Sequence, residues 1–364
     1  AATRVRAAAR PRPRERLRLR AMTTMTGSTA MRELPSGPPL PVALGGAALQ
    51  LCTLGYVWRE HSSARTCLSA PLTCLCDPLH ADPWGFTAVF ALAFALFMWV
   101  VSLRTFPWRG TSDPSIVDRL WSIMPWLYTG YWYFGSRSTG FSPRLSLMFI
   151  LSAMWGIRLT YNFVIKGGFS GGEDYRWVVV RSWYSGWRWE IFNLVFVCLF
   201  QQCTILAFVV PAVPAMQSNT PLGWIDLMAT GLFLVLFAGE TVADRQMYEY
   251  QTEKYRRKSA GEDMGAYARG FIEVGLWAYS RHPNYFCEVS MWWAFYLFSI
   301  PATGAWLNWT IWGAVFLTGL FLPPGASLDI TEAISLTKYP QYPDYQRRVS
   351  RFVPWFPTAA RRAD

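Results

Sequence analysis

Apolar residues fall in long uninterrupted runs along this chain rather than in stripes of helical or alternating period. Most of the runs approach the ~20 residues that a helix needs to cross ~30 Å of hydrocarbon. They cover roughly residues 40–58, 84–103, 120–135, 144–165, 190–214, 224–244, 285–300 and 306–322, of which 120–135 and 285–300 are short. The pattern predicts an all-α, polytopic membrane protein of about eight transmembrane helices.

The lysines and arginines between the runs predict the orientation of the chain. If the N-terminus is cytosolic, the inner segments hold most of these cations, including the cluster from Lys254 to Lys258. The outer segments hold only Arg59, Arg65, Arg137 and Arg144. We therefore expect both termini on the cytosolic side.

Composition supports a membrane protein, because 52% of the 364 residues are hydrophobic and only 16% are charged. The formal charge of +11 could suggest nucleic acid. However, the arginines cluster near the N-terminus and in the gaps between apolar runs, where the charge rule of membranes accounts for them. We expect membrane lipids as partners and no nucleic acid.

Three regions follow from these patterns. Residues 1–35 form an Arg-rich, acid-poor leader or targeting segment, or sequence upstream of the true start. Residues 36–114 form an N-terminal transmembrane pair with a cysteine-containing loop, and residues 115–364 form the main membrane domain. In the loop, Cys67, Cys74 and Cys76 lie between His61 and His80, but the spacing differs from that of structural zinc sites, so we predict no metal. One disulfide is expected there if the loop faces an oxidising compartment.

Five polar motifs occur at the predicted inner boundary, which would place them on one face of the membrane. They are DRLWS at Asp118–Ser122, GGEDYRW at Gly171–Trp177, ADRQMYEY at Ala243–Tyr250, SRHPNY at Ser280–Tyr285 and YPDYQRR at Tyr342–Arg348. Such a convergence suits a polar, anionic cofactor, although inner loops are also simply where charge is tolerated. No GxGxxG follows a strand, so a dinucleotide would not be held by a Rossmann unit.

Several ionisable residues lie on or inside the predicted helices, where such groups are usually functional. They are Asp118, Arg158, Glu240, Asp244 and Glu288. Asn284 and Glu288 are four residues apart and would share one face of a helix that begins at Pro283. In a second interpretation, Arg281 and His282 are interfacial anchors and Glu288 is a satisfied packing residue.

The ordered motifs resemble the steroid 5-alpha-reductase superfamily, and in particular its DUF1295 branch, over about residues 115–357. The resemblance is carried by ADRQM, GLWAYSRHPNYFCEVSMWW and YPDYQRRVSRFVPWFP, and upstream by VDRLWSIMPW, WGIRLTYN and EDYRW. The superfamily is related to isoprenylcysteine carboxyl methyltransferases and sterol reductases. The resemblance implies a helical membrane enzyme with a cytosolic-face cavity, which uses NADPH to reduce a carbon–carbon double bond conjugated to a carbonyl in a lipid or steroid-like substrate.

The same resemblance implies roles for individual residues. Asp118 would lie near the substrate carbonyl and Arg158 near the cofactor. The residues implied to bind the cofactor are Asp244, Asn284, Tyr285 and Glu288, with Arg281, His282, Asp344, Tyr345 and Arg348 closing over its pyrophosphate, ribose or adenine end and Asp174 and Arg176 shaping the inner rim.

Two positions depart from the family pattern. Trp155 stands where steroid-reducing members have a tyrosine that works with the acid on the carbonyl, and an indole cannot act as a proton acid. Tyr128, Tyr131 or Tyr161 could supply the proton, and we include Tyr161 among the predicted catalytic residues. Cys287 stands where the family usually has a small residue such as glycine.

Two other functions remain open at this stage. One is a non-catalytic or accessory subunit of an organellar membrane complex that keeps the reductase fold, which would add other membrane subunits as partners. The other is an S-adenosylmethionine-dependent membrane methyltransferase. The family resemblance favours the endoplasmic reticulum membrane, and the Arg-rich leader admits the mitochondrial inner membrane.

Overall fold

The computed structural model describes residues 37, 40–61, 67, 69–76, 82–103, 112–136, 142–170 and 173–358. These residues form helices, turns and irregular segments, with no strand among them. The predicted all-α class is therefore confirmed for this part of the chain. The Arg-rich leader 1–35 and His80 lie outside the described residues.

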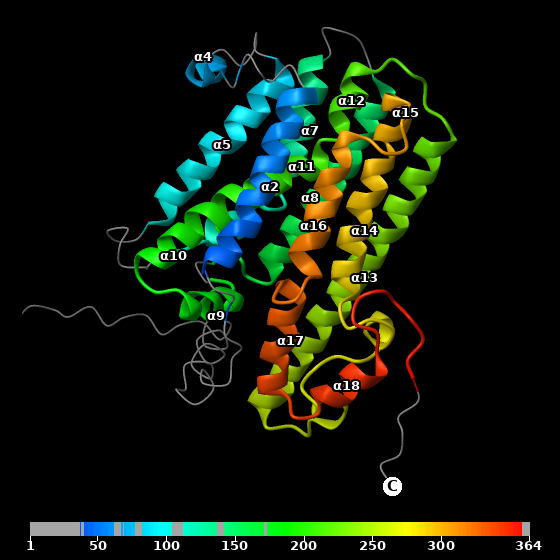
Figure 1. Cartoon of the computed structure of the whole chain (residues 1–364). Helices are drawn as coiled ribbons and strands as arrows, with labels where there is room; N and C mark the ends of the chain where they lie inside the picture. Colours follow the sequence, from blue (N-terminus) through cyan, green and yellow to red (C-terminus); the bar gives the residue numbers. More distant parts are fainter. Residues whose placement is uncertain are drawn as a thin grey trace, which may run out of the picture.

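The helices follow one another along the chain with short connections (Figure 1). Three of them, η5, η6 and η7, are single 3₁₀ turns, and η4 is a π-helix that joins α10 to α11 without a break. The bounds are α2 Leu40–His61, α4 Pro71–Cys76, α5 Pro83–Ser102, α6 Ser115–Leu120, α7 Met124–Gly135, α8 Pro143–Ile165, α9 Tyr175–Trp183, α10 Trp187–Phe192, η4 Asn193–Phe200, α11 Gln201–Val209, α12 Ala212–Gln217, α13 Trp224–Ala260, η5 Gly265–Tyr267, η6 Gly275–Ala278, α14 Pro283–Leu297, α15 Ser299–Thr303, η7 Trp309–Ile311, α16 Trp312–Phe321, α17 Ser327–Lys338 and α18 Tyr342–Arg348.

Four helical segments in the described part are long and apolar enough to cross a membrane, which makes this a membrane protein. They are Pro83–Ser102, Pro143–Ile165, Trp187–Val209 and Trp224–Ala260, and shorter apolar helices cover Leu44–Thr53 and Trp309–Phe321. The short runs predicted at 120–135 and 285–300 form α7 and α14, of 12 and 15 residues. Eight membrane crossings therefore stay a prediction.

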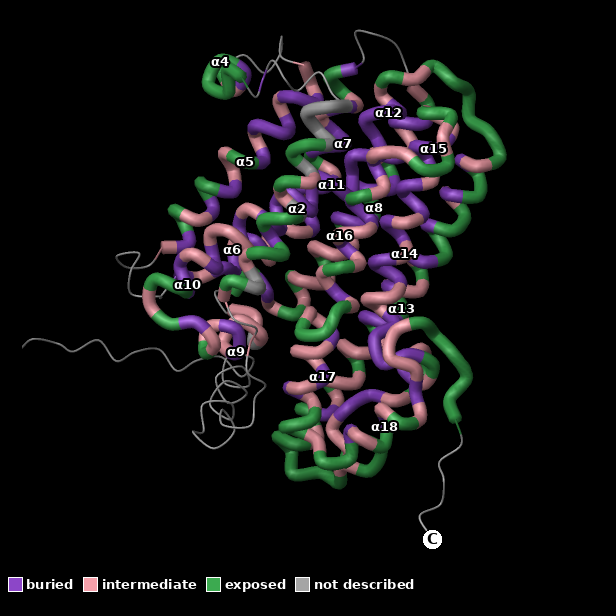
Figure 2. The backbone as a smooth tube through the Cα atoms, in the orientation of Figure 1, coloured by how far each residue is buried: buried purple, intermediate pink, exposed green. Residues whose placement is uncertain are grey.

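Helix α11 lies at the centre of the bundle. Every residue from Gln201 to Val209 is buried, whereas α13 exposes apolar side chains such as Leu227 and Val235 along its outer side (Figure 2). A helix that is buried all round must be surrounded by others, and α5, α7, α14 and α16 all contact it. The exposed apolar faces of the outer helices suit contact with lipid.

One end of the bundle carries a disulfide and a buried ion pair. Cys67 and Cys74 form the disulfide that the sequence led us to expect in this loop, and it packs on Val89 of α5. At the same end, Arg144 at the start of α8 donates to both carboxylate oxygens of Asp226 in the first turn of α13, at 2.7 and 3.0 Å. Both side chains are almost completely buried.

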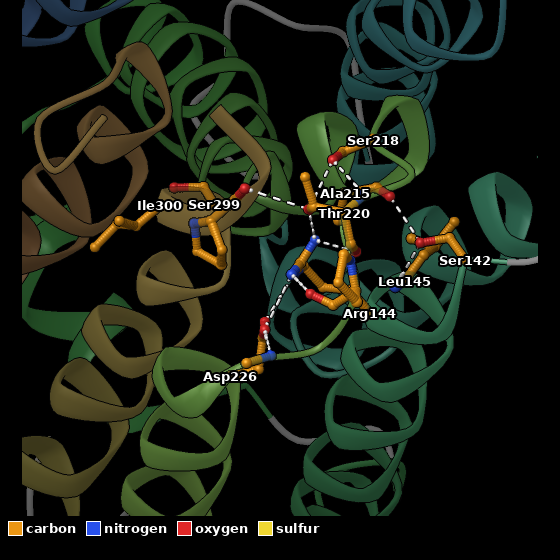
Figure 3. Close-up of polar contacts among 12 residues, drawn as sticks. Ser142, Arg144, Leu145, Ala215, Ser218, Thr220, Asp226, Ser299 and Ile300 are labelled. Atoms are coloured by element: carbon orange, nitrogen blue, oxygen red, sulfur yellow. Dashed lines mark hydrogen bonds and ion pairs between the residues drawn. The ribbon is translucent and has the colours of Figure 1, made fainter. Parts of the chain in front are cut away.

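Figure 3 shows how Arg144 also joins the connection between α12 and α13. Its Nη1 donates to the Thr220 hydroxyl at 2.7 Å, and its Nη2 to the Pro221 carbonyl at 2.9 Å. The Asp226 carboxylate in turn accepts the backbone N–H of Gly223, which starts α13. Every charge in this cluster has a partner, as a buried ion pair requires.

Close packing of α13 on α14 accommodates Cys287. A Cβ added at Gly239 of α13 would lie 2.9 Å from the Cys287 thiol. The thiol therefore occupies the space left by a missing side chain on the neighbouring helix. The departure from the family pattern at Cys287 therefore fills space in the contact between α13 and α14.

We predict opposite effects of alanine at two glycines of α13. Gly231→Ala places its methyl where no atom lies within 4 Å, so it should raise stability by up to about 1 kcal/mol through helix propensity. Gly239→Ala should lower it by roughly 1–3 kcal/mol, because the methyl meets the thiol. Thermal unfolding of the protein in detergent measures both. The double variant Gly239→Ala, Cys287→Ala should recover the loss, and equal effects at the two glycines would contradict this account.

Candidate functional site

Arg158 of α8 is held between two carboxylates of α13. Its Nη1 lies 2.8 Å from Asp244 Oδ2, and its Nη2 pairs with Glu240. The side chains of Arg158 and Glu240 are 11% and 2% exposed. Charged groups in this setting are stable only when paired, so this contact fixes α8 against α13.

Asp244 collects further donors from two helices. Asn162 Nδ2 donates to Oδ2 at 2.8 Å, and Lys166 Nζ lies 3.4 Å from Oδ1. Asn284 Nδ2, from the first turn of α14, reaches the same Oδ1 at 3.5 Å. Arg158, Asn162 and Lys166 are spaced by four residues and therefore line one face of α8.

Glu288 extends this cluster toward the DRLWS motif. It lies one turn after Asn284 on α14 and accepts a hydrogen bond from Trp121 Nε1 at 3.2 Å. Trp121 follows α6, which carries Asp118. Two residues 167 positions apart in sequence therefore meet, and the convergence of the motifs on one face of the membrane stays a prediction.

Asp118 is bound to the EDYRW segment. Trp177 Nε1 donates to its Oδ2 at 2.7 Å. Burial raises the pKa of Asp118 to about 6, with a further contribution from the Asp174 charge and an opposing one from Arg176. A carboxyl with this pKa can both hold and release a proton near neutral pH.

Asp174 and Arg176 form a pair beside Asp118. Arg176 Nε lies 2.8 Å from Asp174 Oδ1, and the Asp174 carboxylate also caps α9 by accepting the Arg176 backbone N–H. Burial acts to raise the pKa of Asp174, but the Arg176 charge and hydrogen bonds outweigh it and lower the pKa. Asp118 and Asp174 thus have pKa values displaced in opposite directions.

Arg281 and His282 contact a different carboxylate, Glu332 of α17. Arg281 donates to both Glu332 oxygens at 2.7 and 3.1 Å, and His282 Nε2 lies 3.0 Å from Oε1. Arg281 Nη1 also donates to the carbonyls of Gln346 and Val349, each at 2.8 Å. We call this set the tail clamp, because it fastens the end of α18 to the start of α14.

Within the tail clamp, an ionised Glu332 lies beside a neutral His282. Burial acts against the charged form of Glu332, but hydrogen bonds from His282 and Arg281 lower its pKa to about 2. Burial lowers the pKa of His282 although Glu332 opposes this. A neutral imidazole that donates its Nε2–H to a carboxylate satisfies both groups.

The other predicted residues of the C-terminal motif lie near the tail clamp. The buried Tyr345 donates its hydroxyl to the Trp277 carbonyl at 2.5 Å, and Arg348 pairs with Glu273 at 2.8 Å. Asp344 is half-exposed and pairs with Arg347. The Tyr285 ring stacks on His282 with 5.6 Å between centroids. Their cofactor roles stay predictions.

Tyr128 and Tyr161, two of the tyrosines considered as proton donors, have surroundings that differ from those of Asp118. Tyr161 is 66% exposed on the outer side of α8, and Tyr128 is buried with its hydroxyl 2.6 Å from Gln202 Nε2. Trp155 lies in the core, edge-on to Trp292 at 4.9 Å, and its Nε1 has no hydrogen-bond partner among the described residues.

The predicted site list omitted several residues that the structure brings into the clusters. Glu240 was named from the sequence as an ionisable helix residue but was given no role in the site. Its spacing of four residues from Asp244 would have added it. The same spacing from Arg158 would have added Asn162, and then Lys166 four residues further on. Trp121, Trp177 and Glu332 carried no such signal, because their partners lie on other helices.

Comparison with known proteins identifies relatives without an assigned activity. A family model described as "Protein of unknown function (DUF1295)" matches residues 98–349. The uncharacterized protein C594.04c of Schizosaccharomyces pombe is 36% identical over 255 residues, which are 67% of this chain and 73% of the yeast protein. No solved structure matches the chain.

We predict that Asp118→Asn changes the pH dependence of stability. Because the folded pKa of about 6 exceeds the ordinary 3.8, the native carboxyl favours folding below pH 4 and loses that contribution as pH rises through 6. As pH rises over this interval, the stability of the variant relative to the native protein should therefore increase, by up to about 3 kcal/mol. Unfolding temperatures from pH 4 to 7.5 measure this.

Asp174→Asn is the control, because its effect on stability should change with pH in the opposite direction. Its carboxylate has a lowered pKa, so its contribution is present at neutral pH and disappears as pH falls through the folded pKa. This variant should be less stable than the native protein at pH 7 and approach it in acid. A pH-independent difference for Asp118→Asn would contradict the interpretation.

We predict that Glu332→Ala costs about 3–5 kcal/mol of stability, because it leaves the buried Arg281 without its counter-charge. Glu249→Ala is the matched control, since it removes an exposed ion pair with Arg245 on α13 and should cost at most about 0.5 kcal/mol. Chemical or thermal unfolding in detergent compares the two. Equal losses would show that the tail clamp does not stabilise the fold.

Proposed function

Because the chain belongs to the DUF1295 family, we propose that it is a membrane-embedded NAD(P)H-dependent reductase of a conjugated carbon–carbon double bond in a lipid or steroid-like substrate. The observation that carries this proposal is the meeting of Arg158, Asp244, Asn284 and Glu288 near the inner end of α8, α13 and α14. The superfamily that the motifs resemble supplies the reaction class.

The polar cluster suits the nicotinamide end of the cofactor. Arg158 Nε and Glu240 Oε2 are buried polar atoms without a hydrogen-bond partner among the described residues. Buried polar atoms are normally satisfied, and a carboxamide offers both a donor and an acceptor. NADPH, when bound, supplies a hydride.

The carboxylates of the polar cluster would also affect the charge of the nicotinamide ring. Glu240, Asp244 and Glu288 would stabilise the positive charge of an oxidised nicotinamide. Arg158 and Lys166 keep the carboxylates from repelling one another. Asn284 orients Asp244 through the 3.5 Å contact between their side chains.

Asp118 is the residue that we propose as the acid on the substrate side. Hydride addition to the beta carbon moves an electron pair onto the carbonyl oxygen, and a proton donated there completes the enol, which then tautomerises to the ketone. A pKa of about 6 suits that donation near neutral pH. Trp177 orients the carboxyl through the hydrogen bond to Oδ2.

The disulfide supports an orientation for this site. Cys67–Cys74 lies at the end of the bundle opposite α17 and α18 (Figure 1). Disulfides form in oxidising compartments, so we propose that the polar cluster and the tail clamp face the reducing, NADPH-containing side. The endoplasmic reticulum membrane is the proposed location, with the mitochondrial inner membrane as the alternative.

We predict that the purified protein in nanodiscs binds NADPH, and that Asn284→Ala and Glu288→Gln each weaken binding about tenfold, the effect of about 1.4 kcal/mol from a lost polar contact. Glu249→Gln, on the exposed part of α13, is the control and should bind like the native protein. Fluorescence titration or calorimetry measures the affinity.

Two outcomes would overturn the proposal. Binding of S-adenosylmethionine in place of NADPH would establish a methyltransferase. Failure to bind either molecule, in a protein that unfolds cooperatively, would favour an accessory subunit that keeps the fold. If NADPH binds, Asp118→Asn should leave its affinity unchanged and abolish turnover of an enone substrate.

A further inference from the structure

The last described residues of the chain form a loop that is fastened to the start of α14. Residues 350–358, which we call the tail loop, pair through their backbone with the segment before the helix. Arg281 N–H donates to the Ser350 carbonyl at 2.8 Å, the Ser280 hydroxyl to the Phe352 carbonyl at 2.7 Å, and Trp355 N–H to the Tyr279 carbonyl at 2.9 Å. The tail loop is therefore held at a fixed position on the bundle.

The tail loop exposes its large apolar side chains. Trp355 is 71% exposed and Phe356 76%, and the Phe356 ring lies 6.1 Å from that of Tyr279, which is itself exposed. Pro354 and Pro357 enclose the aromatic pair and restrict its backbone. A rigid loop that presents two aromatic rings outward loses little conformational freedom when the rings are buried elsewhere.

The position of the tail loop along α13 identifies what surrounds it. Trp277, two residues before Tyr279, donates its Nε1–H to the Ala243 carbonyl of α13 at 3.1 Å. Ala243 follows the helix start at Trp224 by 19 residues, about 29 Å along a helix. This distance equals the ~30 Å thickness of the hydrocarbon core.

The side chains of α13 change character at the same level. Val242 is the last of its strongly exposed aliphatic residues before a charged segment, and Arg245 is exposed over 77% of its side chain. A helix that crosses a bilayer makes this change where it leaves the hydrocarbon. The tail loop thus lies at the level of the lipid headgroups.

Charge around the tail loop complements an anionic surface. The described residues 347–358 contain Arg347, Arg348 and Arg351 and no acidic residue. The internal partners of these arginines are at least partly exposed, and such surface ion pairs contribute little, so they can be exchanged for lipid phosphates. Arginine clusters beside a membrane helix attract anionic lipids.

We propose that the tail loop inserts Trp355 and Phe356 into the headgroup–acyl boundary of the inner leaflet, with the surrounding arginines on anionic lipid phosphates. This surface is independent of the proposed reductase activity. The inserted rings would attach the tail loop to the membrane next to the first turn of α14, where the tail clamp also fastens the chain.

Depth-dependent quenching tests the proposal in full-length protein. Phe356→Cys, in a background with the exposed Cys52 and Cys76 changed to serine, is labelled with an environment-sensitive nitrobenzoxadiazole dye. The protein is placed in nanodiscs of phosphatidylcholine and phosphatidylserine with nitroxides at the headgroup, at a shallow or at a deep acyl position. The dye should be quenched by headgroup and shallow nitroxides several-fold more than by deep ones.

Three further variants decide between the outcomes. Ser259→Cys, exposed near the C-terminal end of α13 and 16 residues beyond Ala243, is the control and should be quenched weakly from every lipid position. Val353→Cys leaves both aromatic rings in place and should behave like Phe356→Cys, whereas adding Trp355→Ser and Phe356→Ser to it should return the dye to water. A water-like spectrum at both reporters, or protection that depends on protein concentration in detergent and so indicates a second copy, would overturn the proposal.

Discussion

The ion pair between Arg158 and the two carboxylates of α13 is the interaction on which the remainder of the site depends. A guanidinium in the C-terminal part of a long apolar helix such as α8 is stable only where its charge is matched, so the ion pair favours one rotation of α8 and α13 about their axes. Once that rotation is set, Asp244 faces Asn284 and fixes the first turn of α14. The cluster thereby orders three helices, and without Arg158 it would hold three carboxylates in close proximity.

Much of this arrangement could be predicted because it follows from local periodicity. Residues four apart share a helical face, which placed Asn284 with Glu288 and would also have placed Glu240 with Asp244. Apolar runs likewise predicted where helices occur. They did not determine which helices span the membrane, since the run 285–300 is divided between α14 and α15, with Phe298 between them, and neither helix alone is long enough to cross a bilayer.

The tail clamp could not be predicted for a physical reason. Arg281 and His282 have no directional preference in the sequence, and their partner Glu332 lies about 50 residues further along in a mixed polar helix without a strong pattern. Which carboxylate an arginine meets is decided by how α17 docks, a tertiary event. The residues on either side of Pro283 therefore have different partners. Arg281 and His282 contact Glu332 in the tail clamp. Asn284 contacts Asp244, and Glu288 contacts Trp121.

Trp155 stands where the resemblance places a tyrosine in steroid-reducing members of the superfamily, so the proposed role of Asp118 depends more strongly on its environment. Trp155 is fully buried against Trp292 and Phe208, so it supports the core and offers no titratable group. Burial is the largest influence on the pKa of Asp118 and raises it. The segment that carries Asp174, Arg176 and Trp177 adjusts this value, because the Asp174 charge raises the pKa further, whereas the Arg176 charge and the Trp177 hydrogen bond lower it. Because all three influences come from one short segment at the start of α9, a displacement of that segment would change the acidity of Asp118 and its orientation together.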